Sequence, residues 1–309
     1  MKADHKAGSA LGIRLPGRGT RRITTFDWVV LAFLLIVFII TFIPLWYVVI
    51  ISLTPLQLTK ASGYNLFLPP TQWSPGAYVQ MLSQSAFLQA LFNSVILTVS
   101  GVTVSLVLTT LTAYALTFKD MPGRNIFLTL IIFTFLFNPG LVPTYLVVKN
   151  LNLLDNYLAI ILPPAINVYY LLVMKVFFQN IPGSLRESAI IDGASELQVL
   201  WRIILPLCKP ILLTIGLFYA VFLWNDYFYP ILYLSNPALT PLPVLLYNIL
   251  TSNGANGINT YVEANALYTV PQDALKMAAV ILSIIPMLCI YPWIQRYFTK
   301  GVLLGSVKE

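Results

Sequence analysis

Long apolar stretches separated by shorter polar connections dominate the pattern of this 309-residue chain. A helix needs about 20 mostly apolar residues to cross the hydrocarbon core of a bilayer. Six stretches reach that length, and each predicts one membrane-spanning helix. They run from Trp28 to Ile51, Ala90 to Phe118, Ile126 to Val148, Tyr157 to Phe178, Leu207 to Tyr229 and Ala274 to Phe298. The pattern therefore predicts an all-α membrane protein with six transmembrane helices.

Prolines interrupt most of these stretches, at positions 44, 139, 143, 163, 164, 286 and 292. Each proline frees a backbone carbonyl, which membrane helices tolerate only against protein or water. The expected kinks serve either gating or packing, and the sequence does not separate the two.

The basic residues indicate the orientation, because Lys and Arg are retained on the cytoplasmic side of a membrane protein. Of the 18 Lys and Arg residues, 15 lie on one side if the N-terminus is inside. Two, Lys60 and Lys149, then lie in the outer connections, and Lys276 lies just inside the last stretch. This asymmetry predicts that both termini and the connection between the fourth and fifth stretches are cytoplasmic.

The remaining segments are tails and loops of one membrane domain. We expect a basic cytoplasmic tail at 1–26, the transmembrane domain at 27–300 and a cytoplasmic tail at 301–309. The outer loops at 52–89 and 230–273 are rich in turn-forming residues, and a short helix is expected within the second, from Leu242 to Thr251. The sequence contains no recognisable internal repeat and no separate soluble domain.

Composition supports the membrane assignment and removes several classes of function. The chain is 58% hydrophobic and only 9% charged, against about 25% charged residues in an ordinary soluble domain. The net charge is +7, but the basic residues flank apolar stretches and do not gather on one aromatic-rich face. Nucleic acid is therefore not an expected partner. With one histidine and two cysteines, no metal cluster and no histidine-based catalytic site are expected.

The predicted cytoplasmic loop at 181–206 encodes two short helices. Ser184 with Glu187, and Ser195 with Gln198, have the spacing of capping boxes at helix N-termini. Gly193 lies between them, where a residue that tolerates positive φ can end the first helix and turn the chain. Taken alone, these capping residues are more typical of an ordinary amphipathic loop than of a functional motif.

The loop resembles the cytoplasmic motif of binding-protein-dependent ABC permeases, which reads EAA, three residues, Gly, nine residues, Ile-x-Leu-Pro. Both spacings are kept, and the one departure is Ser188 in place of the middle alanine. The resemblance implies a type I ABC importer permease fold in which the 184–206 loop docks on a separate ATPase. The candidate coupling residues are Glu187, Ser188, Ala189, Asp192, Gly193, Ala194, Ile203, Leu205 and Pro206.

The same resemblance implies the partners and the cofactors. The chain lacks the GxxxxGK[ST] phosphate-binding loop, so it is expected to be a non-catalytic permease without a cofactor of its own. ATP and Mg would be bound by two copies of an ATP-binding subunit. The other expected partners are a second homologous permease, an extracytoplasmic solute-binding protein and the lipid bilayer of the bacterial cytoplasmic (inner) membrane.

Further similarity, from about Phe92 to the C-terminus, is to carbohydrate importers of the maltose-permease type, especially their shorter second membrane subunit. It is carried by the segments 112–116, 223–227 and 297–308. A sugar or oligosaccharide is therefore the expected cargo. Few basic residues lie in the outer half of the predicted membrane domain. This disfavours recognition of a highly anionic cargo by this subunit alone.

A carboxylate at membrane depth is costly and usually faces a cavity or a partner, which makes Asp226 informative. At helical spacing it shares a face with Phe222, Tyr229 and Tyr233. That face is either a pore wall that stacks on sugar rings or an interfacial aromatic belt with a satisfied carboxylate. The candidate translocation residues are Asn167, Tyr170, Trp224, Asn225, Asp226 and Tyr229.

Two further segments are candidates by resemblance alone. The outer loop before the last stretch corresponds to a loop that enters the sugar cleft of the binding protein in the maltose importer. An ordinary Asn/Gly loop is the alternative reading for its candidate residues, which are Asn253, Gly254, Asn256, Gly257 and Asn259. The tail from Gly301 to Glu309 is implied to enter the ATPase dimer interface.

The rival classes are a secondary transporter or channel and a membrane-embedded enzyme. The first predicts inverted repeats, and the second predicts paired acids, HExxH or an activated serine at membrane depth. The sequence contains neither pattern.

Overall fold

The computed structural model describes residues 25–251 and 270–306, with the backbone alone for 62, 291 and 293–306. This part of the chain contains helices and turns but no strand, as the apolar pattern predicts. The elements are α1 (Thr25–Ser52), α2 (Leu56–Ser62), η1 (Pro70–Gln72), α3 (Gly76–Ser83), α4 (Ser85–Ala115), α5 (Arg124–Leu136), α6 (Leu141–Asn150), α7 (Leu158–Ile161), α8 (Val168–Gln179), α9 (Gly183–Ile191), α10 (Glu196–Val199), η2 (Leu200–Ile204), α11 (Leu205–Leu207), α12 (Lys209–Asn225), α13 (Phe228–Tyr233), η3 (Pro237–Leu239), α14 (Leu242–Thr251) and α17 (Gln272–Ser306).

The chain divides into two compact units, residues 1–47 and 48–309. Most of α1 belongs to the first unit, and its side chains from Thr25 to Leu45 are all exposed. Phe38 stacks on Phe42 and Phe42 on Trp46, with ring centroids 5.2 and 5.9 Å apart. An apolar helix without a polar face is typical of contact with lipid.

Three helices among the described residues, α1, α4 and α17, are long and apolar enough to span a membrane. Two bent pairs raise the number to five if each pair is one span. The third predicted span is such a pair, because α5 and α6 meet at 119°. The chain turns there at Gly140, which has a φ of 82° and follows Pro139. The expectation of one continuous helix from Ile126 to Val148 is therefore wrong.

The fourth and fifth predicted spans are also interrupted. Residues 162–167, which include Pro163 and Pro164, separate the four-residue α7 from the 12-residue α8. The segment from Glu196 to Leu207 meets α12 at 84°, and α12 ends at Asn225. Prolines in these apolar stretches thus divide each stretch into shorter helices, because proline interrupts the backbone hydrogen bonds of a helix.

The centre of the second unit is the packing of α4 against α12. Small residues on α4, at Ser94, Thr98, Gly101, Ser105 and Thr109, follow helical spacing and are buried. Small side chains let two helix backbones approach closely, which is a main source of helix association in membranes. At Gly101 an added Cβ would lie 2.5 Å from Leu223 Cδ1, so α12 packs against the bare backbone of α4.

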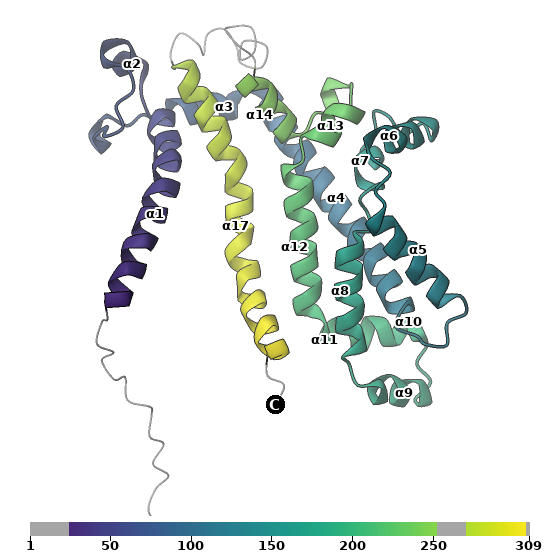
Figure 1. The fold of residues 1–309 in the computed structure, drawn as a ribbon. Coiled ribbons are helices and arrows are strands. Elements are labelled where there is room, and N and C mark those ends of the chain that lie inside the picture. Colours follow the sequence, from purple (N-terminus) through teal and green to yellow (C-terminus); the bar gives the residue numbers. More distant parts are fainter. Residues whose placement is uncertain (1–24, 252–269, 307–309) are drawn as a thin grey trace, which may run out of the picture. The chain divides into compact units, whose positions relative to one another are not determined.

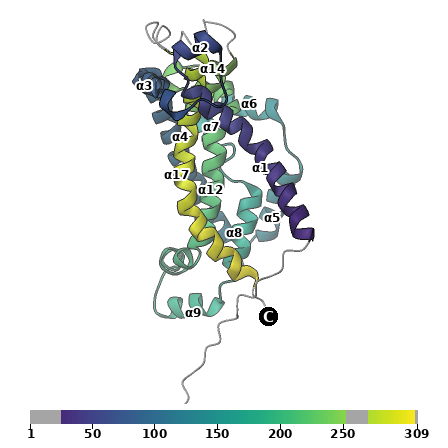
Figure 2. The same cartoon turned by 90° about the vertical axis from the view of Figure 1, so that its left-hand side faces the viewer.

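Two groups of short elements lie at opposite ends of this bundle. The loop that carries α9 and α10 lies at one end, and α14 lies at the other (Figures 1 and 2). The predicted helix from Leu242 to Thr251 is confirmed as α14. The Ser94 hydroxyl accepts a hydrogen bond from the Leu242 amide at 2.7 Å, and the Asn93 amide donates to the Ala238 and Thr240 carbonyls. These bonds fasten α14 and the segment before it to α4.

Candidate functional site

The 181–206 loop forms the two short helices that its sequence predicts, α9 and α10, followed by the π-helix η2. Gly193 has a φ of 85° and stands directly after the last turn of α9. Its amide donates to the Ile190 carbonyl and the Ala194 amide donates to the Ala189 carbonyl, both at 2.9 Å. This pair of bonds is the Schellman motif. In it, the amides of a residue with a left-handed backbone and of the residue after it bond free carbonyls of the last helical turn.

One of the two predicted capping boxes is present. Gln198 donates its amide to the Ser195 hydroxyl, and its side-chain oxygen accepts from the Ser195 amide at 2.9 Å. The box predicted at Ser184 is wrong, because the N-cap of α9 is Pro182, two residues before Ser184, and the helix begins at Gly183. This start places Ser184 in the first turn of α9, which has no side-chain capping hydrogen bond at its N-terminus.

The candidate coupling residues divide between the two faces of the loop. Ala189, Ala194, Ile203 and Leu205 pack against a buried cluster that includes Tyr114 and joins the loop to α4, α8 and α12. The other candidates, Glu187, Ser188, Asp192, Gly193 and Pro206, are exposed. The loop is therefore anchored through its small and apolar residues and presents its polar motif residues outward.

The structure adds apolar residues that the motif comparison did not single out. Ile191 is 84% exposed, and Leu197 and Trp201 are each 60% exposed. Leu197 and Trp201 are four residues apart, which places them on one helical face. That spacing was a usable sequence signal. An uncovered apolar surface of this kind next to polar motif residues is typical of a protein-binding site.

A second addition is an ion pair inside the loop, between Arg186 on α9 and Glu196 at the start of α10. The hydrogen bonds from Arg186 hold the pKa of the Glu196 carboxyl below its usual range. A lowered pKa means that the pair stabilises the loop above the ordinary carboxyl pKa and is lost as pH falls through the lowered value. At neutral pH the pair is therefore intact.

The candidate translocation residues lie in three separate places. Trp224 and Asn225 line a cavity of about 540 Å³ between α12, α14 and α17. The Trp224 indole donates to the Ser283 carbonyl at 3.2 Å. At the same cavity Tyr227 and Tyr247 stack with centroids 5.3 Å apart. Flat aromatic walls with a few polar groups are suited to sugar rings, although most of this lining is aliphatic.

The expected face of Phe222, Asp226, Tyr229 and Tyr233 does not exist as one helical face. The helix ends at Asn225, and Asp226 has an extended backbone with a ψ of 117°. Asp226 Oδ1 accepts hydrogen bonds from the backbone amides of Phe228 and Tyr229 at 3.0 and 3.3 Å. The carboxylate therefore bonds the first two amides of α13. Short acidic side chains favour this role because they bond free amides at a helix start. Tyr229 instead stacks on Tyr233.

Asn167 and Tyr170 lie at the break between α7 and α8. The Tyr219 hydroxyl accepts from the Asn167 amide at 3.0 Å and is 2.8 Å from the Thr109 hydroxyl. The Asn167 side chain in turn caps α8 by accepting from the Tyr170 amide. One phenol on α12 thus joins the break in the fourth stretch to α4, and a role of Asn167 and Tyr170 in translocation stays a prediction.

Removing that phenol oxygen tests the bond across the break. We expect Tyr219→Phe to destabilise the protein by about 1 kcal/mol, the usual size of a hydrogen bond between membrane helices. The measurement is thermal unfolding of the detergent-solubilised protein. Tyr169→Phe is the matched control, because Tyr169 is 58% exposed. Equal melting temperatures for the two variants would contradict the role given to Tyr219.

The candidate residues of the outer loop, Asn253, Gly254, Asn256, Gly257 and Asn259, lie outside the described residues. The N-terminal tail to residue 24 and residues 307–309 also lie outside them.

Comparison with known proteins gives consistent similarities. The model of a family described as "Binding-protein-dependent transport system inner membrane component" matches residues 76–304. The polygalacturonan/rhamnogalacturonan transport system permease protein YtcP of Bacillus subtilis (strain 168) is 43% identical over 284 residues, which are 92% of this chain and 98% of YtcP. Protein LplC of the same organism is 42% identical, over 87% of this chain and 90% of LplC.

A solved structure is similar over nearly the whole length. It is a chain from the crystal structure of a bacterial ABC transporter involved in the import of the acidic polysaccharide alginate. The TM-score is 0.82 at 31% sequence identity, and the match covers 90% of this chain and 98% of that chain.

Proposed function

Because this chain belongs to the family of binding-protein-dependent transport system inner membrane components, we propose that it moves oligosaccharides across the bacterial cytoplasmic membrane, driven by a separate ATPase. The family resemblance predicted from the loop motif is thereby confirmed. The assignment as a membrane permease, and not an enzyme, is also confirmed by the relatives, which are named as transport permeases. The cargo, the coupling and the partners are the proposed part.

The proposed topology is the one that the sequence predicts. Six spans of a type I ABC importer permease cross the membrane within residues 27–300, with the tails 1–26 and 301–309 in the cytoplasm. One of these spans is then the bent pair around Gly140, the fourth is the interrupted segment of α7 and α8, and the fifth contains α12. The similarity in fold to the alginate transporter chain supports this arrangement.

Coupling is proposed to occur at the exposed face of the 181–206 loop. The observation that carries this is the division of the motif between two faces, one packed into the core and one open. An ATP-binding subunit would cover Ile191, Leu197 and Trp201 and would meet the carboxylates of Glu187 and Asp192 with basic side chains. Its movement would pass into α4, α8 and α12, because the loop packs against all three.

The proposed assembly contains this chain, a second homologous permease, two ATP-binding subunits that hold ATP and Mg, and an extracytoplasmic solute-binding protein. The family description supports the binding protein directly. The large exposed apolar side chains of α5 and α6 support contact with lipid or with the second permease.

The cargo is proposed to be an oligosaccharide that contains uronic acids. YtcP is named for polygalacturonan and rhamnogalacturonan, and the similar structure belongs to an importer of alginate, which is an acidic polysaccharide. Few basic residues lie in the outer half of this chain, so recognition of the carboxylates falls to the binding protein or to the second permease. The aromatic residues Trp224, Tyr227 and Tyr247 would then contact ring faces, whatever the charge.

The experiment is uptake by the complete complex in proteoliposomes with its binding protein outside and ATP inside. We expect uptake of oligogalacturonate at least about tenfold above that of a neutral glucan oligosaccharide of equal length, a difference of about 1.4 kcal/mol. A complex whose ATPase cannot hydrolyse ATP is the control and should show no uptake. Uptake in that control would support a secondary transporter, and a preference for the neutral sugar would overturn the uronate assignment.

A further inference from the structure

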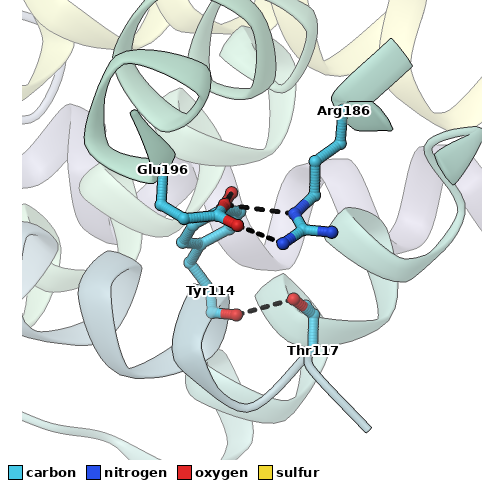
Figure 3. Close-up of polar contacts among 4 residues, drawn as sticks. All are labelled: Tyr114, Thr117, Arg186 and Glu196. Carbon is cyan, nitrogen blue, oxygen red and sulfur yellow. Dashed lines mark hydrogen bonds and ion pairs between the residues drawn. The ribbon is translucent and has the colours of Figure 1, made fainter. Parts of the chain in front are cut away.

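A single carboxylate joins three helices where the 181–206 loop meets the bundle. Glu196, the first residue of α10, accepts from Arg186 Nε on α9 at 3.1 Å and from the Tyr114 hydroxyl on α4 at 2.9 Å, both through Oε2. Its Oε1 accepts from Arg186 Nη2. Figure 3 shows the two parallel bonds of the ion pair with Tyr114 beneath them. A bidentate pair of this kind fixes orientation as well as distance.

Aromatic contacts extend the same connection into the bundle. The Arg186 guanidinium lies over the Phe118 ring, 4.7 Å from its centroid. Phe118 meets Tyr114 edge to face at 5.0 Å, and Tyr114 meets Phe178 on α8 in the same way at 6.3 Å. Arginine suits this position because its flat cation stacks on a ring while it donates a fork of hydrogen bonds. The contacts therefore run from α9 through α10 to the ends of α4 and α8.

Apart from this connection, α9 is held by the packing of Ala189 against the buried cluster. The helix buries none of its own residues, and a turn centred on Gly193 joins it to α10. Tyr114, in contrast, is buried in the cluster between the loop and the bundle. The ion pair and the hydrogen bond from Tyr114 together form a specific polar link between the exposed α9 and the packed α4.

We propose that Arg186, Glu196 and Tyr114 are positioning residues that transmit displacement of α9 to α4, so that ATP hydrolysis is converted into movement of the bundle. This rests on the proposed function, in which the ATPase docks on the loop. Arg186 and Glu196 have side chains that are 35% and 45% exposed, so their loss leaves no buried charge unpaired. Removing the link is therefore expected to alter coupling more than folding.

The test uses the assembled complex in proteoliposomes and measures two rates, oligosaccharide uptake and ATP hydrolysis. We expect Glu196→Gln and Arg186→Gln each to lower the ratio of sugar transported to ATP hydrolysed by about fivefold, the size of effect for a directly contacting pair. Tyr114→Phe should lower the ratio less, because it removes one hydrogen bond and leaves the ion pair. A merely structural residue would change both rates together and leave the ratio constant.

Two further variants make the result specific. Asp120→Asn removes an exposed carboxylate from the same cavity wall as Glu196 and should leave the ratio unchanged. The charge exchange Arg186→Glu with Glu196→Arg re-forms the pair and should restore at least half of the lost ratio. An unchanged ratio in Glu196→Gln, or no restoration by the exchange, would overturn the inference. Absence of ATP-driven uptake by the unaltered complex would instead overturn the proposed function.

Discussion

Replacing Gly193 by tryptophan is expected to lower ATP-driven uptake at least about tenfold, which corresponds to about 1.4 kcal/mol of lost docking free energy. An added Cβ at this position meets no atom within 4 Å, so the indole would project into open space beside α9 and α10. That space is where we propose that the ATPase docks. The measurement is uptake together with the amount of ATPase that co-purifies.

Two further variants distinguish the effect of backbone strain at Gly193 from the effect of side-chain size. Gly193→Val adds little bulk but forces a β-branched residue to adopt a φ of 85°, at a cost of about 1–2 kcal/mol. Gly193→Asn adds a small side chain that tolerates this backbone region and should keep most of the uptake. Normal uptake by the tryptophan variant would remove the docking assignment, because nothing could then cover this turn.

Replacing Gly101 by leucine is expected to be the most damaging change to the fold. Its Cβ would lie 2.5 Å from Leu223 Cδ1 and 3.4 Å from Ile161 Cγ1, so the larger side chain has no space between α4, α12 and α7. Overpacking costs about 1–3 kcal/mol where neighbours can shift, and here two helix backbones would have to separate. We expect the melting temperature in detergent to fall by about 5–10 °C, with severalfold less folded protein recovered.

Two variants control for the size of the substituent at Gly101. Val99→Leu adds volume on the exposed side of α4, where Val99 is 60% exposed, and should leave the melting temperature unchanged. Gly101→Ala should have an intermediate effect, because the Leu223 side chain can rotate away from a single methyl group. If Gly101→Leu melted like Val99→Leu, the close packing of α4 on α12 would be wrong.

Much of the site could be predicted because its signals are local. Gly193 must adopt a left-handed backbone to end α9, and Ser195 with Gln198 caps the next helix through bonds within four residues. Such short-range geometry depends on residue type and spacing alone, and so does the family motif. The Ser184 box failed for an equally local reason, since α9 takes Pro182, two residues before Ser184, as its N-cap.

The interrupted spans show where the apolar pattern reaches its limit. Hydropathy reports that a segment prefers lipid or a protein interior, but it does not distinguish one long helix from two short ones. The proline positions indicated breaks, but the size of the turn at Gly140, 119° between α5 and α6, does not follow from hydropathy. Asp226 was misplaced for the same reason, because a helical face was assumed across a residue at which the helix ends.

The all-α membrane character, the family, the turn at Gly193 and the loop that carries the motif could all be predicted, because each depends on hydrophobicity or on residues a few positions apart. The packing of the folded chain was needed to show which motif residues are anchored and which are exposed, and that Glu196 contacts both Arg186 and Tyr114. Tyr114 and Glu196 are 82 residues apart in the chain. A contact over that separation exists only once α4 and the loop are packed together, so no local pattern could reveal it.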